Sequence, residues 1–145
     1  MSGETLDYYF KGKGSFFNNL LKGDTEYKNW NIKCNMIPES AELFRSLQQR
    51  QGEVDGILNE LKEHEDGPYH NFKRPFFKDF GKGEVPMLPP EVVDKDGNPW
   101  DRNIGIGNGS DITVKVECYP FTNRRTRKRG RAIRLAAVRI DNLVP

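Results

Sequence analysis

The sequence predicts a small, mainly β barrel with one inserted helical arm, formed by a single domain over residues 1–145. Two segments, Glu26–Ile37 and Asp111–Phe121, alternate apolar and polar side chains as half-buried strands do. Between them, apolar residues recur at helical spacing. The chain also contains 14 Gly and 9 Pro, which is typical of a fold with many turns.

The N-terminal third is expected to contribute two strands. Residues 1–9 are interpreted as a loose lead-in, and Phe10–Leu21 as the first strand. In Glu26–Ile37 every second side chain is apolar, and these side chains are Trp30, Ile32, Cys34 and Met36. Pro38 then ends the second strand, because proline cannot donate to a strand ladder.

The helical arm covers about residues 39–64, and Ser40 is its expected N-terminal cap. Its apolar residues form two helical runs: Leu43, Phe44 and Leu47, then Val54, Ile57, Leu58 and Leu61. They predict helices near Ser40–Gln51 and Val54–Glu63. Glu39–Asp66 holds eight acids and three bases, so the arm is acidic, with a net charge of −5.

The second half is predicted to start with an irregular region, residues 67–90, and a short strand at Glu91–Val93. Asp94–Asn98 has strong turn chemistry and leads towards the strand Asp111–Phe121. In the last strand, Arg131–Val144, the apolar positions change parity near Ala136–Ala137, which indicates a β-bulge. The order of these elements is typical of a five-stranded OB-fold barrel with an inserted helical arm.

A strongly basic hairpin loop, residues 122–130, is predicted between the last two strands. Thr122–Arg139 contains eight Lys or Arg residues and no acid, although the whole chain has a formal charge of only +2. Clustered cations repel one another unless a polyanion neutralises them, and arginine forks suit phosphates. The expected phosphate contacts are Arg124, Arg125, Arg127, Lys128, Arg129 and Arg131.

Rings interleave with cations in Asn71–Gly83, a pattern that suits single-stranded nucleic acid. Phe72, Phe76 and Phe77 are candidates for stacking on bases, while Lys73 and Arg74 line the groove. The same rings would equally serve to fix a long loop to the barrel, so both interpretations stay open.

The polar faces of two predicted strands also combine rings with cations. Tyr119 and Phe121 share a face with Lys115, and Tyr27 shares one with Lys33. Flat rings beside cations suit unpaired bases. A single exposed ring would also fit at the packed end of a barrel.

Signals for catalysis are weaker. Asp94, Asp96 and Asp101 resemble the start of a calcium loop, but the segment needs no metal to form a turn. His64 and His70 are expected to be solvated. No metal or other cofactor is expected, and Cys34 and Cys118 are interpreted as buried, reduced thiols. No signal peptide or membrane-spanning run is visible, which predicts an intracellular protein without a membrane partner.

The C-terminal third combines a turn, a strand that ends in a Tyr-Pro pair, a loop and a last strand, and its pattern rests on Ile106, Gly109, Ser110, Val114, Val116, Tyr119, Pro120, Leu135, Val138, Ile140 and Leu143. Upstream, GKGSFFNNL and WNIKCNMIP fit the same order of elements. In these residues and this order, the chain resembles the single-stranded DNA-binding proteins of tailed bacteriophages. The resemblance implies an OB-fold that binds single-stranded DNA in replication, recombination and repair, without catalytic residues.

The resemblance also implies phage replication proteins as partners and the cytoplasm of the infected bacterial host as the location. Two other interpretations stay open. One is a phage metal-dependent nuclease or junction-resolving enzyme that uses acids between Asp94 and Asp111. The other is an adaptor whose acidic arm binds a basic protein and whose basic loop binds RNA.

Overall fold

The computed structural model describes residues 5–49, 56–57, 59–79, 83–122, 125, 127 and 129–144. Its elements, in chain order, are β1 (Leu6–Ser15), α1 (Phe17–Leu21), β2 (Asn29–Met36), α2 (Pro38–Gln48), β3 (Tyr69–Pro75), β4 (Phe77–Asp79), β5 (Glu84–Pro86), β6 (Glu91–Asp94), β7 (Asp111–Thr122) and β8 (Arg129–Asn142).

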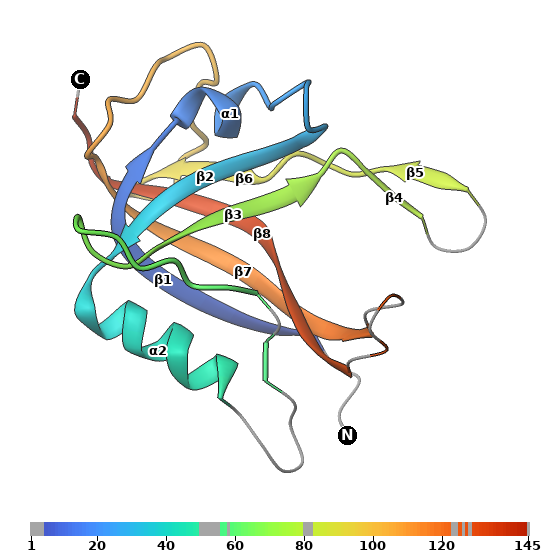
Figure 1. Ribbon diagram of the computed structural model, residues 1–145. Coiled ribbons are helices and arrows are strands. Elements are labelled where there is room, and N and C mark those ends of the chain that lie inside the picture. The colour runs from blue at the N-terminus through green and yellow to red at the C-terminus, as the bar shows by residue number, and fades with distance from the viewer. Residues whose placement is uncertain are drawn as a thin grey trace.

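A single curled sheet with the order β3-β2-β1-β7-β8-β6 forms the barrel wall (Figure 1). Its neighbours pair antiparallel, except that the short β6 runs parallel to β8. A separate hairpin of β4 and β5 projects from the end of β3. The prediction of a mainly β barrel is confirmed, with β3 as a sixth strand that the sequence did not predict.

An extended segment between α2 and β3 occupies the space between β3 and β8. Lys62 pairs with Tyr69 of β3, and Ile57 bridges to Arg131 of β8. The side-chain oxygen of Asn59 also accepts a hydrogen bond from the backbone of β8. The described residues of the predicted second helix are therefore not helical, because their backbone groups bond to strands; residues 54, 55 and 58 lie outside the described part.

Helix α2 confirms the first predicted helix and covers one end of the barrel (Figure 1). Pro38 lies in its first turn, while the predicted cap, Ser40, lies inside the helix. Its hydroxyl accepts a hydrogen bond from the backbone N–H of Lys11, at 2.8 Å, and so joins α2 to β1. The Phe44 ring of α2 packs 5.5 Å from that of Phe10, and Phe10 stacks 5.6 Å from Phe72.

The N-terminal segment differs from its prediction. Strand β1 already begins at Leu6, and the backbone leaves the strand at Phe16, whose φ is 64°. The short helix α1 then buries Phe17, Leu20 and Leu21. Arg102 donates hydrogen bonds to the carbonyl oxygens of Leu20 and Leu21 and so satisfies the C-terminal end of α1.

Residues 67–90, which were predicted to be irregular, contain β3, β4 and β5, because the backbone of β3 pairs along its length with β2. Predictions from Glu91 onward are confirmed. The short strand is β6, and the side chain of Asp94 accepts hydrogen bonds from the backbone N–H groups of Asp96 and Asn98 in the turn that follows. The register of β7 against β8 shifts so that Ala136 is the extra residue of a bulge.

Both cysteines are buried, as predicted, and burial raises the pKa of the Cys34 thiol to about 12. Within the described ranges, no helix has the length and apolar character needed to cross a membrane.

Candidate nucleic-acid interface

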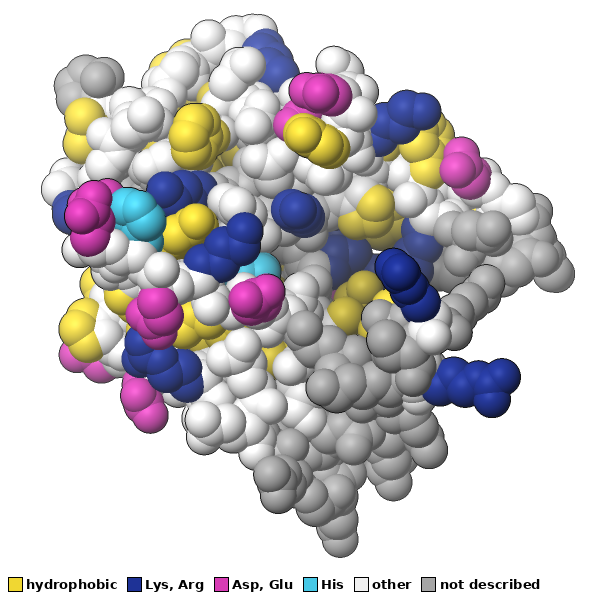
Figure 2. Space-filling model, viewed as in Figure 1, with side chains coloured by type: hydrophobic (Ala, Val, Ile, Leu, Met, Phe, Trp, Pro, Cys, Tyr) yellow, Lys and Arg dark blue, Asp and Glu magenta, His cyan; other side chains and the backbone are white. Residues whose placement is uncertain are grey.

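The outer face of β2 and β3 carries polar and cationic side chains. Cross-strand register sets Lys33 opposite Asn71 and Lys73 opposite Asn31. The ammonium nitrogen of Lys33 also lies 4.4 Å from the centre of the Tyr69 ring, a cation–π contact. The structure therefore brings Lys33 and Lys73 to one surface. Figure 2, viewed as in Figure 1, shows dark-blue cations among white, yellow and magenta side chains.

A hollow of about 330 Å³ lies where the β1–β2 connection meets this face. It is lined by Phe16, Asn19, Asp24, Tyr27, Asn29, Asn31, Asn71 and Lys73. The Tyr27 side chain is 72% exposed and that of Phe16 is 58% exposed.

Sequence reasoning identified Tyr27 but missed Phe16, which it placed inside a strand. A usable signal was present. Phe16 and Phe17 are adjacent, and two adjacent side chains of a half-buried strand point to opposite faces. One of the two rings therefore had to be exposed or the strand had to end, and both occur here.

The basic hairpin connects β7 to β8, as predicted, and the ladder closes with Thr122 opposite Arg129. Arg125 and Arg127 are exposed in the connection, and Arg127 has a left-handed backbone with φ 58°. Two predicted phosphate contacts, Arg124 and Lys128, lie outside the described residues. For Arg129 only the backbone is described, at the start of β8.

Tyr119 of β7 lies in a cluster of charges rather than on an open face. The Lys78 ammonium lies 4.6 Å and the Arg134 guanidinium 4.8 Å from the centre of its ring. Glu117 pairs with Arg134 at 3.6 Å on the same side of the sheet. Burial raises the pKa of Tyr119, and the Arg134 charge opposes that shift. Burial has the opposite effect on the Lys78 ammonium, because it lowers the pKa of that group, and the Arg134 charge lowers it further.

Two predicted contact residues are buried, which contradicts their proposed roles. Phe72 is 1% exposed because it lies on the inward parity of β3 and packs in the core. Arg131 is 3% exposed, at the point where its backbone N–H donates to the carbonyl of Gly56. Neither side chain is placed to meet a nucleic acid.

Two other predicted residues, Arg74 and Phe76, have contacts within the fold. The Arg74 guanidinium donates to the carbonyl oxygen of Leu88 at 2.6 Å and to that of Leu135 at 3.2 Å. It also donates to the carboxylate of Glu117 at 3.3 Å. Phe76 packs edge-on against Trp30, with ring centres 4.6 Å apart.

Lys115 lies on a different wall of the barrel, 3.8 Å from the Asp7 carboxylate. Phe77 and Phe121 are 47% and 41% exposed, so these two rings are accessible. Of the predicted stacking residues, Tyr27, Phe77 and Phe121 therefore present open rings, while Phe76 does not.

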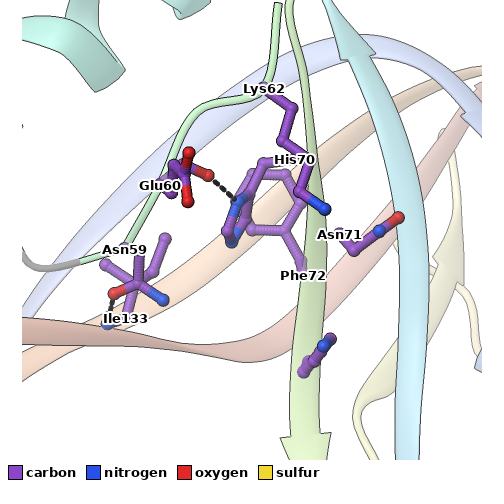
Figure 3. A pocket seen from close by; sticks show the side chains of 8 residues that line it. Asn59, Glu60, Lys62, His70, Asn71, Phe72 and Ile133 are labelled. Atoms are coloured by element: carbon purple, nitrogen blue, oxygen red, sulfur yellow. Dashed lines mark hydrogen bonds between the residues drawn. The ribbon is translucent and has the colours of Figure 1, made fainter.

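A second hollow, of about 180 Å³, lies between β3, the extended segment and β8 (Figure 3). His70 Nδ1 lies 2.8 Å from the carbonyl oxygen of Glu60, and its ring packs 4.9 Å from that of Phe72. The prediction that His70 is solvated is therefore wrong. Burial lowers its pKa to about 4, which keeps the ring neutral at physiological pH.

Two acids of the predicted nuclease site have structural contacts of their own. Asp94 accepts its turn hydrogen bonds, which lower its pKa, and Asp111 pairs with Lys13 at 2.9 Å. No group of three or more His, Cys, Asp or Glu side chains in the described part of the chain is placed to hold a metal ion.

Comparison with solved structures identifies proteins of the same architecture. The structure of gp2.5, a single-stranded DNA-binding protein encoded by bacteriophage T7, aligns with a TM-score of 0.69 at 15% identity, over 98% of this chain and 89% of that one. The single-stranded DNA-binding protein from bacteriophage Enc34 aligns with a TM-score of 0.60 at 11% identity, over 95% and 80% of the two chains.

This chain has the fold of those phage proteins. A C-terminally truncated form of the Enc34 protein gives a TM-score of 0.57 at 10% identity, over 95% of this chain and 86% of that chain. The OB-fold expected from the sequence is thereby confirmed. No protein-family model matches the chain, and no curated protein matches it.

Proposed function

We propose that this protein binds single-stranded DNA without catalysing a reaction and with little dependence on sequence. One observation carries the proposal: in a barrel of this fold, the outer face of β2 and β3 presents Lys33, Lys73 and Tyr69 on one surface. OB-folds bind oligonucleotides with this face and with the loops at its ends.

Each loop adds residues that suit the same ligand. The connection between β1 and β2 presents the open rings of Phe16 and Tyr27, and the β7–β8 connection presents Arg125 and Arg127. Rings stack on bases of any kind and cations follow the phosphates, which is how single strands are held without readout of sequence. The phosphate contacts of Arg124, Lys128 and Arg129 remain predictions from the sequence.

The proteins of T7 and Enc34 that share this fold are both described as single-stranded DNA-binding proteins, which supports the same activity here. By extension, we infer a role in phage replication, recombination or repair in the cytoplasm of the infected host. Replication proteins are the expected partners.

Fluorescence anisotropy with a labelled thymidine oligonucleotide and a matched duplex, each at two salt concentrations, tests the proposal. We expect tighter binding of the single strand and a fall in affinity with salt. Equal affinity for the duplex would contradict the proposal. Preferential binding of RNA would favour the adaptor, and cleavage of the strand with magnesium or manganese would favour the nuclease.

The double variant Arg125→Ala/Arg127→Ala tests the hairpin. If each side chain neutralises one phosphate, the slope of log affinity against log salt falls by about 0.7 per phosphate lost. Lys13→Ala is the matched control, because this cation pairs with Asp111 on the outer side of β1. Unchanged affinity and slope in the double variant would remove the hairpin from the interface.

A further inference from the structure

The exposed ring of Phe16 is not explained by the fold. Its backbone φ of 64° lies in the left-handed region, which a bulky residue rarely occupies. The backbone N–H of Phe16 donates to the side-chain oxygen of Asn108, at 3.2 Å, and this contact holds the conformation. Glycine or asparagine would meet this backbone requirement more easily, and a ring that is 58% exposed adds little to the core.

The second ring of the hollow stands on a turn held by Asp24. The backbones of Asp24 and Asn29 exchange two hydrogen bonds, of 2.7 and 3.2 Å. Asp24 Oδ1 also accepts from the backbone N–H groups of Glu26 and Tyr27, at 3.0 and 3.3 Å. These contacts fix the base of the Tyr27 side chain before any ligand arrives, which lowers the entropy lost on binding.

A chain of amides forms another part of the lining. Asn19 donates to Asn31 at 3.3 Å, and Asn31 donates to Asn29 at 2.8 Å. Other polar side-chain atoms of the lining make no hydrogen bond to the described residues. They are Asn29 Nδ2, Asp24 Oδ2, and both the oxygen and the nitrogen of the Asn71 side-chain amide. Each amide offers both donors and an acceptor, so the hollow presents both kinds of group to a ligand.

These features describe a site for a flat, polar, heterocyclic group. We propose that the hollow binds one unstacked nucleobase against Phe16 and Tyr27, and that it prefers a base with an exocyclic amino group over thymine. The preference follows from Asp24, because a carboxylate accepts a hydrogen bond from an amino group such as N4 of cytosine. Lys73, at the edge of the hollow, pairs with the adjacent phosphate.

This inference rests on the proposed function and adds a base preference to it. A hollow of about 330 Å³ is at the small end of ligand sites, which suits a single nucleoside better than a longer segment. The rest of the interface stays tolerant of sequence, so the preference is confined to one position of the bound strand.

Phe16→Ala and Tyr27→Ala test the stacking. Each is expected to weaken binding of a cytidine oligonucleotide roughly 5- to 150-fold, the range for loss of one stacked base, with no change in salt slope. The matched control is Tyr9→Ala, since Tyr9 is 54% exposed on a different wall of the barrel. Circular dichroism and thermal melting confirm that each variant is folded.

Asp24→Asn tests the preference. The amide oxygen still accepts the backbone hydrogen bonds of the turn, while the negative charge is lost. We expect the wild type to bind cytidine oligonucleotides more tightly than thymidine oligonucleotides, and the variant to lose that difference without losing affinity for thymidine.

These experiments distinguish a failure of the nucleobase site from a failure of single-stranded DNA binding itself. If the wild type binds no single strand, the proposed function fails. If it binds, but Phe16→Ala and Tyr27→Ala match Tyr9→Ala or cytidine shows no advantage over thymidine, the inference fails and the function stands.

Discussion

The two faces of β3 both carry polar and cationic side chains, but those of one face stabilise the fold and those of the other point towards solvent. Inward, His70, Phe72 and Arg74 contact the core, the extended segment and β8. Outward, Asn71 and Lys73 stand beside the polar residues of β2. Both faces hold a cation, and the inward face also holds Phe72, one of the rings predicted to stack on bases.

The comparison shows that strand parity decides what a cation or a ring does. Arg74 is only 14% exposed and meets three acceptors within the fold, whereas Lys73, one residue earlier, is exposed. Substitutions on the inward face should therefore lower stability, and those on the outward face should lower affinity for DNA.

The largest expected effect is that of Phe72→Ala on the inward face. Removing a fully buried ring that stacks on Phe10 leaves a cavity and should cost about 3–5 kcal/mol of unfolding free energy. Chemical denaturation measures the loss. Phe77→Ala is the control, since Phe77 is 47% exposed and its loss should change stability little. An equal loss in both variants would contradict the role assigned to parity.

His70 should make stability depend on pH. Its folded pKa of about 4 lies below the ordinary value of 6.5, so the unfolded chain binds the proton more readily. The contribution is fully present above pH 6.5 and is lost as the pH falls towards 4, by at most about 3 kcal/mol.

Denaturation of the wild type and of His70→Gln across this pH range checks the prediction. Glutamine retains a donor for the carbonyl of Glu60 but does not titrate, so its curve should be flatter. A wild type and a variant with the same pH dependence would contradict the assignment.

A smaller loss is expected for Arg74→Ala. The variant leaves Glu117 without one of its two arginine partners and frees two backbone carbonyls, which should cost about 1–3 kcal/mol. Arg74→Lys should recover only part of the stability, because one ammonium cannot reproduce the planar fork. Binding by the folded variant should stay near wild type; a large selective loss of affinity would instead place Arg74 in the interface.

The smallest expected change in stability is that of Lys73→Ala, on the outward face. It should stay within about 0.5 kcal/mol of wild type, because Lys73 is exposed. Its effect should appear in binding, with the salt slope reduced by about 0.7 for one phosphate contact. If Lys73→Ala lowered stability and left the salt slope unchanged, Lys73 would have the structural role assigned to the inward face.

Strong local patterns predicted much of the fold. Alternation identified β2 and β7, helical spacing identified α2, and the change of parity at Ala136 identified the bulge of β8. The second predicted helix failed although its apolar spacing was helical. Ile57 and Lys62 instead pair with β8 and β3, so the long-range partners outweighed the local preference.

The candidate interface was only partly predictable for a related reason. Lys33, Lys73 and Tyr27 were identified from composition and parity, while Arg74 and Phe72 were assigned outward although they lie two residues apart on the inward face. Phe16 was missed because its exposure depends on a single left-handed residue.

The sequence by itself determined the mainly β class, five of the six barrel strands in their chain order and the position of a basic hairpin between the last two, but not β3. These depend on periodicity and on charge density, which are local properties of the chain. Only the tertiary structure decided which rings and cations face outward, because that depends on register, on the backbone conformation of Phe16 and on an extended segment that covers Arg131. Such contacts join residues far apart in the chain, and no local pattern specifies them.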